Sequence, residues 1–259
     1  MSRPEKTANL KYRYENWRGD TLAAAPSAFA QFLSERGYHP RSSAHGDKLC
    51  QLLLDDLLSG CSPLREFALS QGLVHRLNLT LNPGKPMSWN LDLVVGPARG
   101  PRSSALPLPN GTPEDIWLAI DAKTIMTEHG KARRNRQRDL NSLHDILHRQ
   151  NPRMIVGGLV VVNIAQRFRS PLRPDTTSHR NIERLVEGTV QMIRDLPRAP
   201  PEGGPGLDAV GVIVVKHTNL PGDRTSVVEV PPAPPLGDPV HYETFLKDLC
   251  NAVRLRYYM

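Results

Sequence analysis

Apolar residues recur at the spacing of helices along the first part of the chain. Pro26 suits the first position of a helix and Gly37 the position that ends one, so the pattern predicts a helix over 26–36. The segment KLCQLLLDDLL has leucines at helical intervals and predicts a second helix over about 47–59, with Asp47 as its N-cap.

Three strands are expected next, because apolar and polar residues alternate with the period of a sheet. They cover 73–81, 89–95 and 116–123. The turn NPGKP joins the first two, and a proline-rich excursion over 96–115 separates the second from the third. The pattern predicts an antiparallel meander.

The second half alternates helical and strand patterns. A helix is expected over 131–149, with Leu140, Leu143 and Leu147 on one stripe and Lys131, Arg134 and Arg138 on another. The apolar run over 154–163 predicts a central strand covered on both faces. The remaining expected elements are a helix near 178–195, strands over 208–217 and 226–230, and a helix over about 239–255. The order α-β-β-β-α-β followed by α-β-β-α predicts an α/β fold, with a central mixed sheet flanked by helices.

Composition favours one domain over the whole of 1–259, with residues 1–44 as an N-terminal lead. The chain of 259 residues is 39% hydrophobic, enough for a substantial core, and its 24 prolines gather in clusters that indicate surface loops. No apolar run approaches the ~18 residues of a membrane helix, and the charged N-terminal segment is unlike a signal peptide. We therefore expect no membrane partner.

Cysteine usage indicates a cytoplasmic protein. Cys50, Cys61 and Cys250 are odd in number and form no CxxC pair. Neither a disulfide framework nor a four-thiolate zinc site is expected, which favours a reducing compartment.

Positive charge is concentrated in one segment. The formal net charge is +7, and 131–153 has seven basic residues against Asp139 and Asp145, which gives this segment +5. Regularly spaced cations on a helix match the phosphate repeat of a duplex and predict a DNA-binding face, with a solvated helix face as the alternative. The candidate phosphate contacts are Lys131, Arg133, Arg134, Arg136 and Arg138.

Two carboxylates and a lysine carry the most specific chemistry. Asp92 lies inside the second predicted strand, and Asp121-Ala122-Lys123 ends the third. Buried carboxylates need a compensating charge, which Mg²⁺ bound by Asp92, Asp121 and the Ala122 carbonyl would supply, with Mn²⁺ as a substitute. The strand period places Lys123 on the face of Asp121, where its ammonium can orient an attacking water. A solvent-facing pair is the alternative.

These residues resemble the motif of the restriction-endonuclease-like PD-(D/E)xK nuclease superfamily. The matching residues are Asp92 in NLDLVV and Asp121-Ala122-Lys123 in LAIDAKT, and the resemblance covers about 45–165. It implies a restriction-endonuclease-like catalytic core and Mg²⁺-dependent phosphodiester hydrolysis. The chain departs from the family pattern at Leu91, where proline is common, and at Asp121, where glutamate is more frequent.

The resemblance also implies further candidates near the metal. Members often place a carboxylate of the first helix there, for which Asp47 is the first candidate and Asp55 the second. A helix cap and a solvated face are the alternatives for these two residues. Glu128 and His129 are expected to line the substrate channel or to lie exposed.

Other motifs are weaker. His144 and His148 have the spacing of a zinc pair, but no third ligand is evident, and packing is the alternative. Lys85 in NPGKP lacks the glycine and hydroxyl of a phosphate-binding P-loop. The few aromatic residues do not favour a platform that stacks single-stranded bases.

We therefore expect a metal-dependent endonuclease of the type II restriction kind, which cleaves double-stranded DNA in a restriction-modification system against phage. Enzymes that it resembles usually form homodimers or higher homo-oligomers, and 166–259 would complete the sheet and supply recognition and assembly. The alternatives are an anti-phage effector nuclease activated by a nucleotide signal, a catalytically inactive DNA-binding module, and a small-molecule enzyme with an enclosed pocket near Asp121.

Overall fold

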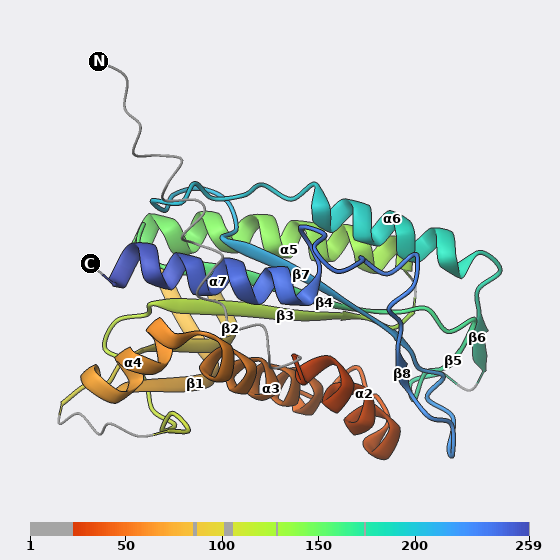
Figure 1. The fold of residues 1–259 in the computed structure, drawn as a ribbon. Coiled ribbons are helices and arrows are strands. Elements are labelled where there is room, and N and C mark those ends of the chain that lie inside the picture. The colour runs from red at the N-terminus through yellow and green to blue at the C-terminus, as the bar shows by residue number, and fades with distance from the viewer. Residues whose placement is uncertain (1–22, 85–86, 101–105, 128, 174, 259) are drawn as a thin grey trace.

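A six-stranded mixed sheet with helices on both faces forms the molecule (Figure 1). The computed structural model describes residues 23–84, 87–100, 106–127, 129–173 and 175–258. The strand order is β1-β2-β3-β4-β7-β8, in which β3, β4 and β7 are parallel and the other neighbours are antiparallel. The predicted α/β fold, with its antiparallel meander and central mixed sheet, is confirmed.

The elements follow the predicted order with small shifts at their ends. The first half contains α2 (Ala25–Arg36), α3 (Ala44–Gly60), α4 (Ser62–Gln71), β1 (Leu73–Gly84), β2 (Met87–Pro97), β3 (Leu118–Ile125) and α5 (His129–Gln150). The second half contains β4 (Ile155–Asn163), β5 (Arg167–Arg169), β6 (Thr176–Ser178), α6 (Ile182–Arg194), β7 (Ala209–Lys216), β8 (Ser226–Val227) and α7 (Tyr242–Tyr257). The sequence pattern did not predict α4 or the short β5–β6 pair.

The core consists of two apolar layers, one on each face of the sheet. Helices α2, α3, α4 and α7 pack on one face, and α5 and α6 pack on the other. Strand β4 is buried along its whole length, with Leu159 and Val161 in the first layer and Val160 and Val162 in the second. This confirms the prediction of a central strand covered on both faces.

Gly158 lets α5 lie close to the sheet. A Cβ at this position would be 2.8 Å from Leu140 Cδ2, which is closer than carbon atoms pack. Gly158 is paired in register with Asp121 of β3. Because Gly158 has no side chain, α5 can pack close to the sheet beside β3, the strand that carries Asp121 and Lys123.

The described part of the proline-rich excursion covers the outer edge of β1. The His75 N–H donates to the Pro109 carbonyl at 3.0 Å, and the Gly111 N–H donates to the His75 carbonyl at 2.9 Å. An edge strand with unpaired backbone groups invites pairing with other chains, so this coverage protects the sheet.

Cys61 and Cys250 form a disulfide that joins the α3–α4 junction to α7. The expectation that the cysteines form no disulfide was therefore wrong, and the argument from cysteines for a reducing compartment does not hold. The two cysteines are 189 residues apart, and only the packing of both helices on one sheet face brings them together. Cys50 is buried and free.

Helix α3 begins earlier than predicted, and this changes the position of Asp47. Its N-cap is Ser43, so Asp47 lies in the first turn of the helix and is not the cap. The leucine spacing placed the helix correctly, but its first turn is polar and carried no signal.

None of the described helices combines the length and apolar character needed to cross a membrane.

Candidate functional site

Strands β1 and β2 change face at the same level. The paired residues Leu77 and Leu93 pack in the layer of α3 and α7, whereas the next pair, Leu79 and Leu91, packs in the layer of α5. Asn78 lies between the two pairs and has a φ of 52°. A positive φ at a non-glycine residue interrupts the alternation of a strand, which accounts for the change of face.

Asp92 lies across from this irregularity, at the point where the β2–β3 ladder stops. The ladder ends at the pair Leu93 and Ile120, and its continuation would place Ala122 opposite Leu91. Instead, the Ala122 N–H donates to Asp92 Oδ2 at 2.7 Å. The N–H and C=O of a strand residue point toward the same neighbour, so the Ala122 carbonyl also faces this gap between β2 and β3, which we call the fork.

Asp121 and Lys123 lie beside the fork, on the face covered by α5. Lys123 Nζ donates to Asp121 Oδ1 and lies 3.6 Å from Asp92 Oδ2, so one ammonium serves both carboxylates. Asp121 is only 1% exposed, and its Oδ2 has no hydrogen-bond partner among the described residues. The sequence prediction that these three side chains meet is confirmed.

Burial controls the protonation of this cluster. It raises the pKa of Asp121 to about 7, with the Lys123 charge opposing the rise and the Asp92 charge adding to it. Burial alone would lower the pKa of Lys123, but the Asp121 and Asp92 carboxylates outweigh it and raise that pKa above its ordinary value. Further positive charge near Asp121 would favour its ionised form.

Of the two acidic candidates on α3, Asp47 is connected to the fork and Asp55 is not. Asp47 Oδ1 accepts a hydrogen bond from Asn78 Nδ2 at 2.6 Å, and Asn78 lies opposite Asp92. Asp55 is exposed and accepts from Gln51 of its own helix at 3.3 Å. The structure therefore agrees with the solvated-face alternative for Asp55.

The five candidate cations of α5 do not share one face. The exposed ones are Lys131, Arg134 and Arg138. Arg133 reaches α6, because a Cβ at Gly188 would lie 2.5 Å from its Nη1 atom. Arg136 is partly buried, and its Nη1 donates to Asp139 Oδ2 at 2.9 Å. Three of the five candidates are thus displayed toward solvent as a phosphate-binding surface requires.

His129 is buried, which contradicts the expectation that it lies exposed or lines a channel. Its Nε2 is 2.7 Å from the Asn163 carbonyl oxygen, and its ring packs on His179 with centroids 5.0 Å apart. Burial lowers its pKa. The residue fastens the start of α5 to the end of β4. Glu128, the other candidate in this segment, lies outside the described residues.

His144 and His148 are buried and each already has a partner. The Gly206 N–H donates to His144 Nδ1 at 3.1 Å, and His148 Nε2 lies 3.0 Å from the Met154 carbonyl oxygen. These contacts agree with the packing alternative. Within the described ranges, no group of three or more His, Cys, Asp or Glu side chains is placed to hold a metal ion. The fork therefore offers two carboxylates and a carbonyl rather than three acidic side chains.

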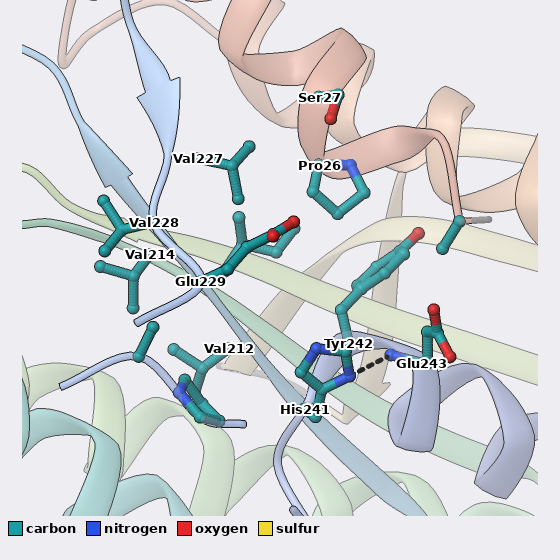
Figure 2. Close-up of a pocket in the computed structure, with 14 residues that line it drawn as sticks. Pro26, Ser27, Val212, Val214, Val227, Val228, Glu229, His241, Tyr242 and Glu243 are labelled. Carbon is teal, nitrogen blue, oxygen red and sulfur yellow. Dashed lines mark hydrogen bonds between the residues drawn. The ribbon is translucent and has the colours of Figure 1, made fainter. Parts of the chain in front are cut away.

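A cavity of about 100 Å³ lies between α2, β8 and α7 (Figure 2). Its lining includes Pro26, Glu229, His241 and Tyr242, but none of the fork residues. This cavity is not the enclosed pocket near Asp121 that a small-molecule enzyme would need.

Two asparagines that the sequence pattern did not predict fix the backbone of the strands that carry the site. Asn78 provides the left-handed backbone opposite Asp92 and binds Asp47. Asn163 is fully buried and its Nδ2 donates to the Met126 and His217 carbonyls at 3.2 and 2.8 Å. An asparagine inside an apolar alternating segment is the signal that could have found both, because Asn tolerates positive φ and bonds to backbone groups.

Comparisons of the chain with protein-family models, with curated proteins and with solved structures find no match. The function is therefore argued from the fork and its surroundings.

Proposed function

We propose that the chain is a Mg²⁺-dependent endonuclease for double-stranded DNA with a restriction-endonuclease-like core. The fork carries the proposal. There Asp92 Oδ2 accepts the hydrogen bond of the Ala122 N–H, in place of a carbonyl of β2, and Asp121 and Lys123 lie beside it. Support also comes from the order of the elements, in which an antiparallel β1–β2–β3 meander is followed by α5 and the parallel strand β4.

The atoms of the fork suit a hard divalent cation. Mg²⁺ prefers carboxylate and carbonyl oxygens, which Asp92, Asp121 and Ala122 provide. The buried Asp121 Oδ2 has no partner among the described residues, and an unpartnered buried oxygen is costly unless a ligand completes it. When bound, Mg²⁺ would polarise the scissile phosphate, and Mn²⁺ should substitute for it.

Lys123 supplies the other chemical function of the site. Its ammonium stands between two carboxylates and is 21% exposed, so it is held in place and still reachable from solvent. There it would orient the attacking water through a hydrogen bond and offset the negative charge that develops on the phosphate. The exposed cations Lys131, Arg134 and Arg138 would hold the duplex by its phosphates.

Among such nucleases, a type II restriction endonuclease is our first choice. In this proposal the enzyme is cytoplasmic and acts as a homodimer or higher homo-oligomer, so that two sites address two strands. Residues 166–259, which complete the sheet with β7 and β8, would supply recognition and assembly.

Cleavage of several unrelated plasmids in Mg²⁺ tests the proposal. We expect discrete fragments from the parent protein, no cleavage with a chelator, and a loss of about 10³-fold in the Lys123→Ala variant. Lys216→Ala, which removes an exposed lysine at the end of another strand, is the matched control and should cleave like the parent.

Other outcomes identify the alternatives. Complete degradation, or cleavage only with an added nucleotide, would favour the effector nuclease. Salt-sensitive DNA binding without cleavage in Mg²⁺ or Mn²⁺ would favour the inactive DNA-binding module. Cleavage at the parent rate by Lys123→Ala would refute the mechanism.

A further inference from the structure

Arg136 differs from the other cations of α5 by its position on the helix. It precedes Leu140, Leu143 and Leu147 at intervals of four, three and four residues, so it belongs to the stripe that faces the sheet. All three leucines are fully buried. The stripe that packs α5 onto the sheet therefore contains a positive charge one turn before Leu140.

The packing of Leu140 fixes where this charge lies. Leu140 sits over Gly158, and Gly158 is paired with Asp121. Helix α5 connects two parallel strands and must run back along β3. One helical turn toward its start covers about 5.4 Å, and two residues along a strand cover about 6.6 Å. Arg136 is one turn before Leu140 and Lys123 is two residues after Asp121, so Arg136 lies at the level of Lys123 along the sheet.

The contacts of Arg136 leave part of the guanidinium available. Its side chain is 33% exposed, and Nη1 donates to Asp139 Oδ2 at 2.9 Å. Its Nε is buried and has no partner among the described residues. A buried donor without an acceptor costs about 1–3 kcal/mol.

Arg136 and Lys123 also interact as like charges. The positive charge of Arg136 acts on Lys123 in opposition to the stronger attraction of the Asp121 and Asp92 carboxylates. Two like charges near one another beside the fork repel. An anion between them would relieve the repulsion and would give the guanidinium an acceptor besides Asp139.

We propose that Arg136 is a catalytic residue that binds the scissile phosphodiester, in a role separate from that of the exposed cations on the same helix. The planar guanidinium can donate to two phosphate oxygens at once, and Asp139 fixes its orientation. Lys123 then contacts the same phosphate from the strand side. This inference rests on the proposed nuclease function and adds to it the group that binds the reacting phosphate.

Single-turnover cleavage at saturating DNA tests this role, with Arg136→Gln and Arg136→Lys as the variants. Both should cleave about 10²-fold more slowly than the parent, because a lysine cannot reproduce the two-point contact. Their melting temperatures should stay close to that of the parent. Arg184→Gln, which removes an exposed arginine of α6, is the matched control and should cleave at the parent rate.

The exposed Arg134 gives the contrast within α5. Arg134→Gln should act on DNA affinity and its salt dependence, whereas the Arg136 variants should act on the rate at saturation. The inference fails if Arg136→Gln cleaves at the parent rate when DNA saturates it, or loses only affinity as Arg134→Gln does. If the parent protein itself cleaves no DNA, the proposed function has failed. If Lys123→Ala is inactive and Arg136→Gln is not, only the role of Arg136 has failed.

Asp139→Asn is a second variant that leaves Arg136 in place. It removes the charge that orients the guanidinium, so the rate at saturation should fall, by less than in Arg136→Gln. A parent rate in Asp139→Asn would contradict the orienting contact, and a rate below that of Arg136→Gln would show that Asp139 acts independently.

Discussion

Two buried carboxylates of the sheet region differ in how completely they are bonded. Asp208 is 3% exposed at its side chain, and both of its oxygens are used. It accepts from the Val156 N–H at 2.8 Å and from two nitrogens of Arg256, which also donates to the Met154 carbonyl at 2.7 Å. Asp121 is as deeply buried, but only its Oδ1 accepts a hydrogen bond from a described donor, Lys123, and the other carboxyl group beside it is Asp92, which raises its pKa.

This difference separates a structural cluster from a candidate site. A buried carboxylate whose oxygens are all bonded repays part of its burial cost by tying chain segments together, here the C-terminal helix α7 to β4. A buried carboxylate with a free oxygen retains that cost, so another function must account for it. The two carboxylates are similarly buried, but Asp208 is matched by one arginine, whereas Asp121 shares one lysine with Asp92 and has fewer partners.

The largest effect is expected at the incomplete cluster. Asp121→Asn should lower DNA cleavage by about 10³-fold, because the amide removes a negative ligand and charge from the fork. Its stability should change by less than about 1 kcal/mol, since the amide avoids the cost of a buried charge. Single-turnover cleavage and thermal melting measure the two quantities. A variant that cleaves within tenfold of the parent would show that the fork is not the site.

The opposite result is expected at the complete cluster. Arg256→Met should reduce the free energy of unfolding by about 3–5 kcal/mol, because Asp208 is left buried without its counter-charge. Urea denaturation measures the loss. Arg254→Met on the same helix, which leaves the Asp208 contacts intact, should lose far less.

A double variant separates the loss of the Arg256 contacts from the cost of leaving the Asp208 charge unpaired. Asp208→Asn with Arg256→Met should recover part of the stability, since no charge remains unpaired. The folded fraction of each variant should still cleave DNA at the parent rate. Slow cleavage by well-folded Arg256→Met would mean that the two clusters do not differ as we propose.

Strand β4 connects the two clusters, and Gly158 tests that connection. Gly158→Val would meet Leu140, so it should cost about 1–3 kcal/mol in stability and displace α5 from the sheet. Cleavage should slow with the displacement of Arg136. Gly46→Ala is the control, because no atom lies within 4 Å of the added Cβ. Parent-like cleavage in a destabilised Gly158→Val would argue against the placement of Arg136 at the level of Lys123.

The smallest effect concerns pH and a group outside both clusters. Burial lowers the pKa of His217 to about 4, although its hydrogen bond with Asn219 opposes the shift. The unfolded chain binds this proton below about pH 6.5 and the folded chain only below about 4, so acidification between these values favours unfolding. His217→Gln should therefore lose less melting temperature than the parent between pH 6.5 and 4. Equal losses would show that His217 does not contribute.

The sequence predicted most of the sheet and the meeting of Asp92, Asp121 and Lys123. Strand alternation is a local property, and it placed Asp121 and Lys123 on one face without any tertiary information. The sideways reach of Asp92 to the Ala122 N–H was not predictable, because it depends on an irregular residue in another strand. The pairing of Cys61 with Cys250 was missed because it depends on the packing of α3 and α7 on one face of the sheet.

Helix α5 shows a different limit. Its charge was visible in the sequence, and the positions of Arg136 and the leucine stripe were visible too. Helical phase predicted Lys131, Arg134 and Arg138 as one stripe opposite the leucines, and these three are the exposed cations. Arg133 and Arg136 were nevertheless grouped with them as phosphate contacts by charge alone, and the structure shows both as partly buried.

The matched change of face at Asn78 and Asp92 has a consequence for how the hairpin can vary. Because both strands switch layers at one level, removing a residue from one strand alone would turn its outer part toward the wrong layer. Removing two residues from each strand on the same side of the switch would keep both the layers and the pairing, and would shorten the hairpin. Length changes in this hairpin should therefore be tolerated only as compensating pairs.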